Sequence, residues 1–122
     1  MKYLCMVLVD EKKLEALSAS ESQALDDESL AYDDSLRKRG HLIAAQALES
    51  VQTATVVRVK NGKVSVTDGP YAETNEQIGG FLLIEAQDLN QAIQLAANVP
   101  VIRLGAIEVR PIKELSASEP KR

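Results

Sequence analysis

Two turn signals and several carboxylates lie together in the segment VTDGPYAETNEQIGGF, residues 66–81. Asp68, near its start, has two interpretations. As a structural residue, it stabilises an Asp-Gly-Pro turn through hydrogen bonds between its side chain and the backbone. As a functional residue, its carboxylate stands on a rigid turn at the mouth of a cleft, where it would act as a general base or bind a ligand.

Two residues are candidate proton donors for a base at Asp68. His41 is the only histidine of the chain, and imidazole is the side chain that ordinarily exchanges protons near neutral pH. Tyr71 follows the Asp-Gly-Pro turn, and its phenol would fill a pocket or lie at the wet edge of a dimer interface. The predicted catalytic set is therefore Asp68, His41 and Tyr71. The structural alternative is that all three are surface or packing residues.

The same segment supplies the predicted ligand-binding residues. Glu73 and Glu76 are three residues apart, so a helical turn would place both on one face. Such a pair either holds a cation or belongs to a solvated loop. The predicted ligand-binding set is Asp68, Gly69, Pro70, Tyr71, Glu73 and Glu76.

Other common sites are not expected. One histidine without paired cysteines gives no zinc spacing, so we predict no metal and no cofactor. Gly79-Gly80 is too weak a signal for a phosphate loop, because no Lys-Ser/Thr follows it. The glycine pair instead predicts a β-bulge or a close approach of two backbones.

Composition excludes several classes of partner. The net charge is −4 and aromatic residues make up 3% of the chain, which argues against binding to nucleic acid. No run approaches the roughly 20 apolar residues that span a bilayer. Cys5 is the only cysteine and lies in an apolar run, so we expect a buried, inert thiol in a soluble, cytoplasmic protein.

Hydrophobic periodicity predicts an alternation of strands and helices. In chain order these are a strand 2–9, a helix between Ser20 and Gly40, a strand 41–48, a hairpin 53–69, a strand 80–86, a helix 89–97 and a strand 105–112. Ser20 and Gln23 match a capping box at the start of the first helix. Asp88 is the expected cap of the second helix. Its predicted buried stripe is Leu89, Ala92, Ile93, Ala96 and Ala97.

The hairpin is the clearest local signal. Asn61-Gly62 stands between two alternating runs, and this dipeptide supplies the positive φ angles of a two-residue type I′ turn. The turn pairs Lys60 with Lys63, Val59 with Val64, Arg58 with Ser65 and Val57 with Val66. We expect the face formed by the four valines to be packed.

This order of elements predicts an α+β fold of the ferredoxin-like βαββαβ type with an extra β-hairpin. Both helices would cover one face of an antiparallel sheet and leave the other open and apolar. Because an exposed apolar face is an association surface, we predict a homodimer packed through it. Residues 1–113 would form one domain, and residues 114–122 a polar, flexible tail.

The motif DGPYAETNE, Asp68 to Glu76, resembles the signature of the YCII-related family, in its DGPF-domain branch. The usual motif there is Asp-Gly-Pro-Phe-Ala-Glu-Thr-Lys-Glu, so Tyr71 stands in place of Phe and Asn75 in place of Lys. The likeness continues through Gly79-Gly80, Ile84-Glu85, Asp88-Leu89 and the closing EVRPI, and so covers most of the chain.

The resemblance implies a dimeric α+β barrel of ferredoxin-like subunits. In another branch of the superfamily, which includes a dehydrochlorinase, a His on the first helix and an Asp near the end of the second form the proposed catalytic pair. This chain carries neither at those places, so we do not transfer that chemistry. DGPF-type genes often stand beside alternative sigma factors, which implies a regulatory or accessory role.

Three functions follow as hypotheses. The first is a small-molecule binding or accessory dimer, with a cleft lined by residues 68–76 and a link to a sigma factor. The second is a cofactor-independent lyase or isomerase that uses Asp68 as its base, with His41 or Tyr71 as the acid. The third is a structural interaction module without a ligand.

Overall fold

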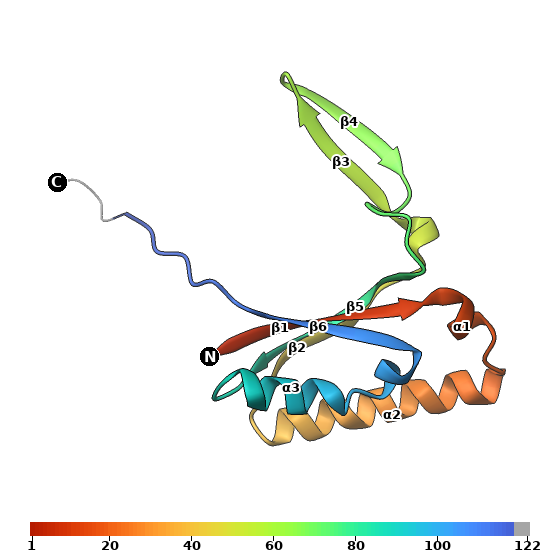
Figure 1. Cartoon of the computed structure of the whole chain (residues 1–122), viewed down its shortest axis with the longest axis vertical. Coiled ribbons are helices and arrows are strands. Elements are labelled where there is room, and N and C mark those ends of the chain that lie inside the picture. Colours follow the sequence, from red (N-terminus) through yellow and green to blue (C-terminus); the bar gives the residue numbers. More distant parts are fainter. Residues whose placement is uncertain (119–122) are drawn as a thin grey trace.

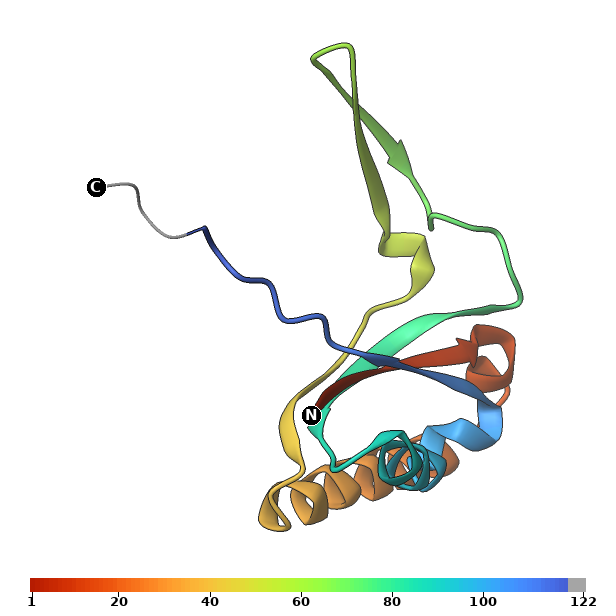
Figure 2. The ribbon, with the colours of Figure 1, turned by 60° about the vertical axis from the view of Figure 1, so that its left-hand side comes forward.

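The computed structural model describes residues 1–118, which form one four-stranded sheet, one separate hairpin and a layer of helices (Figure 1). The elements are β1 (Lys2–Asp10), α1 (Glu11–Glu15), α2 (Ala19–Lys38), β2 (Leu42–Ala47), η1 (Val51–Thr53), β3 (Thr55–Lys60), β4 (Lys63–Asp68), β5 (Glu76–Glu85), α3 (Leu89–Ala97), η2 (Pro100–Leu104) and β6 (Gly105–Pro111). The main sheet has the order β2-β5-β1-β6 and each neighbouring pair is antiparallel. This is the predicted ferredoxin-like arrangement, and α2 and α3 both lie on one face of the sheet (Figure 2).

β1 shows how the sheet divides its two faces. Its side chains alternate, with Tyr3, Cys5, Val7 and Val9 buried toward the helices. The intervening Leu4, Met6 and Leu8 are only half-buried on the open face. Alternation of this kind follows from the two-residue period of a strand, and here both sets are apolar.

α2 begins earlier than the sequence predicted. The capping box joins Ser18 and Glu21, not Ser20 and Gln23: Ser18 Oγ accepts from the Glu21 amide, and Glu21 Oε1 accepts from the Ser18 amide. Both pairs match the Ser-x-x-Glu/Gln pattern, and the helix begins at the one two residues upstream. At the other end, Gly40 has a φ of +81° and ends the helical segment.

The buried face of α3 also differs from the prediction. Ala92, Leu95 and Ala96 are buried, whereas Leu89 and Ile93 are each about half exposed. The helix is apolar on most of its circumference, so two neighbouring stripes fit the helical period equally well. Asp88 caps α3 as predicted, since its side chain accepts from the Gln91 amide.

Gly79 and Gly80 form both of the predicted features. The pairing of β1 with β5 shifts register between Val7 and Leu8, because Val7 pairs with Gly80 and Leu8 with Ile78. Gly79 is thus the extra residue of a bulge. A Cβ on Gly80 would lie 2.8 Å from the backbone oxygen of Gln46, so that position requires glycine for the close approach of β2.

The hairpin has the predicted register, from Lys60 opposite Lys63 to Val57 opposite Val66. It forms a two-stranded sheet of its own that projects away from the helices (Figure 1). The expected packing of its valine face is wrong within the single chain, where the four valines are 62–68% exposed. Local turn chemistry fixes which residues face each other, but it does not supply a surface to cover them.

The base of the hairpin is tied to the body by Glu11. Its Oε1 accepts from the Val51 amide at 2.8 Å, and its Oε2 accepts from Ser50 Oγ at 3.1 Å. These bonds fix the start of η1, from which β3 departs. Glu11 therefore sets where the hairpin leaves the domain.

No helix within residues 1–118 combines the length and apolarity that a bilayer crossing requires. Residues 112–118 follow β6 without a helix or strand. The rest of the predicted tail, residues 119–122, lies outside the described residues.

Tyr32 joins the two helices and offers a test of their packing. Its hydroxyl donates to the Leu95 carbonyl at 2.6 Å. We expect Tyr32→Phe to lower the free energy of unfolding by about 1 kcal/mol, because the Leu95 carbonyl loses its partner. Chemical denaturation would measure this change. Tyr71→Phe is the matched control, since Tyr71 is 79% exposed and should show no effect; equal losses in both variants would contradict this role of Tyr32.

Candidate functional site

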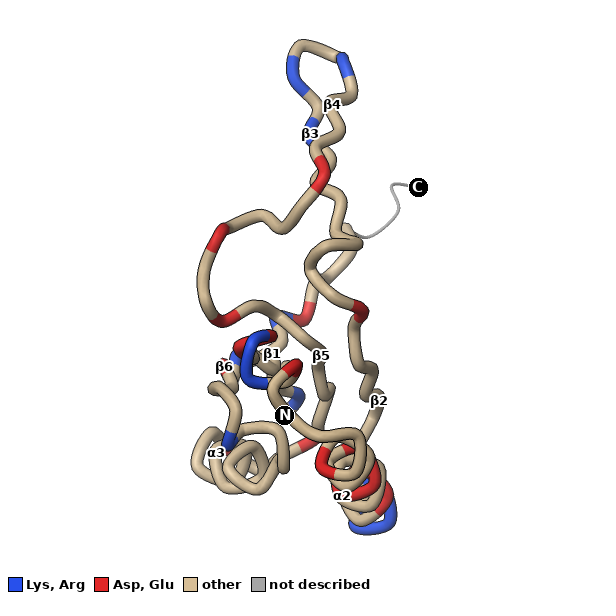
Figure 3. The backbone as a smooth tube through the Cα atoms, turned by 90° about the vertical axis from the view of Figure 1, so that its right-hand side faces the viewer, with Lys and Arg blue, Asp and Glu red and all other residues tan. Residues whose placement is uncertain are grey.

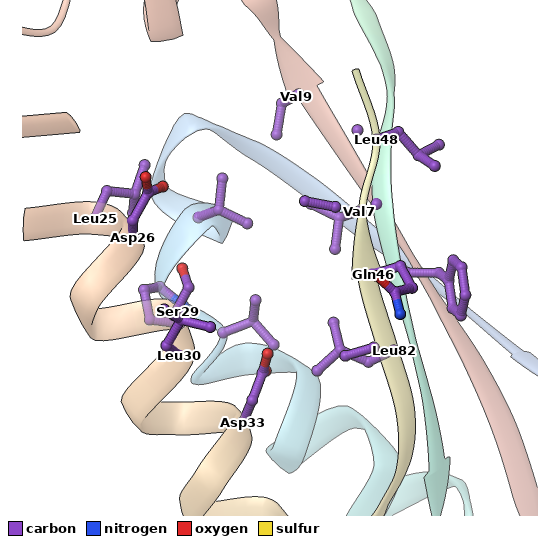
Figure 4. Close-up of a pocket in the computed structure, with 18 of the residues that line it drawn as sticks. Val7, Val9, Leu25, Asp26, Ser29, Leu30, Asp33, Gln46, Leu48 and Leu82 are labelled. Carbon is purple, nitrogen blue, oxygen red and sulfur yellow. The ribbon is translucent and has the colours of Figure 1, made fainter. Parts of the chain in front are cut away.

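A cavity of about 530 Å³ lies between α2 and the helix-facing side of the sheet. Figure 4 shows α2 on one side of it and the strands on the other, with side chains from both extending into the space. Its strand wall comes from β1, β2 and β5, and Val99, Pro100 and Val101 close one end. The α1–α2 side contributes Leu14, Leu25, Asp26, Ser29, Leu30 and Asp33.

The cavity exists because the strands facing α2 carry small residues. Ala45, Gly79 and Gly80 line it and fill little volume. Protein interiors are otherwise packed as densely as organic crystals. Gly79, the extra residue of the bulge, and Gly80, which the close approach of β2 requires, therefore also leave room beneath α2.

Asp33 is one of five polar residues that line this cavity, with Glu11, Asp26, Ser29 and Gln46. It is half-buried on α2 and extends toward Leu82 of β5. Burial raises the pKa of the Asp33 carboxyl above its ordinary value, and the nearby Arg37 guanidinium opposes that rise only in part. A carboxylate that is poorly hydrated gains more than usual from a cationic or hydrogen-bond-donating ligand.

One pattern in the sequence indicates this site, although the sequence prediction was centred on Asp68 instead. Asp26, Ser29 and Asp33 follow one another at i, i+3 and i+7, which places them on one helical face. That face adjoins the apolar stripe through Leu25 and Leu36, both buried. Because acidic residues that border a buried stripe mostly lie on a solvated face, this spacing alone does not single out Asp33.

A second cavity, of about 490 Å³, lies at the base of the hairpin. Pro70, Tyr71, Ala72, Thr74 and Glu76 of the motif segment border it, but Asp68, Gly69 and Glu73 do not. Leu8 and Ile78 from the open face of the sheet form its floor. The segment predicted to line a cleft thus adjoins a hollow on the open side of the sheet.

Asp68 is an exposed residue at the end of β4. Within residues 1–118 its carboxylate takes part in no hydrogen bond, so it does not cap its own turn. The backbone at this point is held across the hairpin, because the Gly69 amide donates to the Ala54 carbonyl at 2.8 Å, next to the pairing of Thr55 with Asp68. Gly69 has a φ of +105°, a conformation that favours glycine.

The structure does not bring His41 and Asp68 together within one chain. His41 precedes β2, and its Nδ1 lies 2.8 Å from the carbonyl oxygen of Glu85 at the far end of β5. Asp68 stands beyond the opposite end of that strand, in the segment that leads into Glu76. Tyr71 lies on the hairpin side, with the Arg58 guanidinium 5.4 Å from its ring centre.

Two further observations bear on the chemistry. Cys5 is 1% exposed, and burial raises the pKa of its thiol to about 11, so the reactive thiolate is scarce at neutral pH. In the part of the chain that the structure describes, no three His, Cys, Asp or Glu side chains gather as metal ligands would.

Comparisons with known proteins agree with this fold. The YCII-related domain matches residues 1–116. An uncharacterised protein of Rhizobium meliloti (strain 1021) is 31% identical over 114 residues, which are 92% of each chain. Among solved structures, the 5-chloro-2-hydroxyhydroquinone dehydrochlorinase from Burkholderia phenoliruptrix AC1100, in complex with 2,5-dihydroxybenzoquinone, is similar with a TM-score of 0.56. That similarity covers 93% of this chain and 94% of the other, at 16% identity.

The solved structure confirms the α+β fold, in which helices cover one face of an antiparallel sheet. At such low identity it is informative about the fold alone. The DGPF branch stays a prediction from the motif at Asp68–Glu76. The match along residues 1–116 and the 31% identical relative establish the wider family: the chain belongs to the YCII-related domain family.

Proposed function

We propose that this protein is a small-molecule binding protein whose ligand occupies the cavity between α2 and the sheet. The observation that carries the proposal is Asp33, a half-buried carboxylate with a raised pKa at an apolar cavity of about 530 Å³. Ligand sites are typically concave and mostly apolar, with a few polar groups that orient the ligand. This cavity has that composition.

The lining defines the chemical class of ligand. Valine and leucine side chains of β1, β5 and α2 suit the apolar face of a compact, ring-sized molecule. Asp33 and Asp26 offer acceptor oxygens, and the side chain of Gln46 can both donate and accept. We therefore infer a single-ring molecule with hydroxyl or amino substituents. The ring ligand of the dehydrochlorinase, a protein of the same fold, supplies the first probe.

Catalysis is the second candidate function, and the raised pKa of Asp33 favours it. General bases work best when their pKa lies nearer the working pH than that of an ordinary carboxyl group. Asp33 suits that role better than Asp68, which is exposed and borders neither cavity. A lyase or isomerase would convert the bound ring, and proton NMR of the mixture would show new resonances. An accessory protein would return it unchanged.

We further propose that two copies associate through the open face of the sheet. Leu4, Met6, Leu8, Phe81 and Leu83 lie there half-buried, and Ile78 is 47% exposed. Register places them in facing pairs, Leu4 with Leu83, Met6 with Phe81 and Leu8 with Ile78. If the protein has the accessory role that the DGPF resemblance implies, ligand binding would be its signal.

The ligand proposal predicts a specific effect of Asp33→Asn. A panel of hydroxylated and aminated single-ring compounds, including 2,5-dihydroxybenzoquinone, would be screened by NMR. We expect binding of at least one compound, with shifts at Val7 and Leu82. Asp33→Asn should weaken it at least about tenfold, because a hydrogen bond to a charged group is lost.

Asp34→Asn is the matched control for this experiment. It removes the same charge from the same helix, but its carboxylate pairs with Lys38 at 2.9 Å on the surface. We expect it to leave ligand affinity unchanged. Equal weakening in both variants, or shifts confined to Pro70–Thr74, would refute the proposed site.

The raised pKa of Asp33 predicts that Asp33→Asn changes how stability depends on pH. Because the folded-state pKa exceeds the ordinary value of 3.8, the unfolded chain loses this proton first as the pH rises. The ionised carboxylate therefore lowers the free energy of unfolding at pH values above the raised folded-state pKa. It has no such effect below the ordinary pKa. We expect Asp33→Asn to raise Tm slightly at pH 7 without ligand, and the gain to vanish below pH 3.8. Thermal unfolding across this range checks it, and a lower Tm at pH 7 would contradict it.

A further inference from the structure

The hairpin β3–β4 presents an apolar face that nothing in the described part of the chain covers. Val57, Val59, Val64 and Val66 share that face and are 62–68% exposed. An isolated two-stranded hairpin is marginally stable in water. Four exposed valines side by side would be a liability on a free surface. The alternation of the sequence therefore implies a surface that packs on them.

We propose that the valine face of each hairpin packs against the body of a second copy of this chain, so that the two hairpins clasp the dimer. The proposal rests on the dimer through the open sheet face and extends it. Its first support is the direction of the hairpin. Figures 1, 2 and 3 show that the hairpin rises on the side of the sheet opposite α2 and α3. A copy seated on the open face would lie beside it.

The second support is that the open face of the sheet adjoins the base of the hairpin. The cavity at the base of the hairpin is floored by Leu8 and Ile78 of the open face. Its opposite wall comes from Val51, Ala54 and Tyr71, where the hairpin begins and ends. The open face and the hairpin base therefore form one hollowed surface. A second copy that covers the open face would therefore also approach the base of the hairpin.

The third support is charge. The segment 55–68 holds three basic residues, Arg58, Lys60 and Lys63, and one acidic residue, Asp68, for a net charge of +2. Because the whole chain carries −4, the remainder carries −6, which is −4 less +2. Figure 3 shows basic residues near the tip of the hairpin and residues of both signs on the body, where acidic residues are in excess. Arg58, Lys60 and Lys63 lie on the face of the hairpin opposite the valines. They would therefore reach the acidic body of the second copy at the rim of the contact, where opposite charges favour association.

Symmetry makes this arrangement self-consistent. A two-fold axis through the open face would place the hairpin of each copy on the body of the other. Both valine faces would then be covered in the same way. The second copy would also close the cavity that Pro70, Tyr71 and Ala72 border. The motif segment would then line an enclosed space only in the dimer.

Val59→Thr/Val64→Thr tests the contact without altering the fold of the chain. Threonine keeps the β-branched shape, and both sites are exposed in the single chain, so the hairpin should persist. We expect sedimentation analysis of the full chain to show a dimer dissociation constant at least about tenfold larger than that of the native protein. Val59→Ile/Val64→Ile keeps the face apolar and is the control that should retain the dimer.

The outcomes separate this inference from the dimer proposal. A native chain that is monomeric at every concentration would overturn both. A native dimer whose dissociation constant is the same in the threonine variant would overturn the clasp and leave the sheet-face dimer standing. Weakening by threonine but not by isoleucine supports the clasp.

Cross-linking gives a second measurement that does not depend on a variant. Mixed dimers of ¹⁵N-labelled and unlabelled chains would be treated with a carbodiimide, which joins lysine to carboxylate at contact distance. We expect Lys60 or Lys63 of one copy to be linked to a carboxylate on the body of the other. Links from these lysines that join only residues of the same copy would contradict the clasp.

Discussion

The pairing of β1 with β5 across the bulge at Gly79 is the constraint on which both cavities depend. β1 lies between β5 and β6 in the sheet, so its register fixes the position of every other strand. The bulge inserts one residue between Val7 and Leu8 on the facing strand. At the bulge, the Leu48 amide donates to the Gly79 carbonyl at 2.9 Å, which is the last backbone bond between the β2 segment and β5. The bulge thus marks where the chain after β2 leaves the sheet, while β1 and β5 stay paired as far as Asp10 and Glu76.

The same bulge separates two environments that differ in chemistry. Beneath the sheet, the space left by Gly79 and Gly80 is bounded by α2 and carries Asp33 at its edge. Above the sheet, Ile78 and Leu8 form an apolar floor next to the motif segment. Glu11 connects the two, because it lines the lower cavity and also accepts from the Val51 amide at the hairpin base. The Glu11 side chain therefore contributes both to the rim of the lower cavity and to the position of the hairpin base.

Most features set by neighbouring residues were predictable from the sequence, although the capping box of α2 was predicted two residues too late. Features set by distant surfaces were not predictable. Asn61-Gly62 fixed the hairpin register, Asp88 the start of α3 and the glycine pair the bulge, because each is a local backbone requirement. The exposure of the valines, the buried stripe of α3 and the partial burial of Asp33 depend on which surfaces lie across from them. The sequence favours Asp68 over Asp33 because a turn is visible in sequence, whereas partial burial of a helical carboxylate is not.

The valine face shows how a failed local expectation can still be informative. Alternation along β3 and β4 is a property of selected residues, and it requires a covering surface whether or not the chain supplies one. Within residues 1–118 the helices are already engaged with the opposite side of the main sheet, and the only large apolar area beside the hairpin is the open face, which is itself uncovered. A symmetric pair of chains would cover both of these uncovered surfaces and bring the basic hairpin of each copy to the acidic body of the other. The valines would then be packed as the sequence predicts, although within the single chain that prediction is wrong.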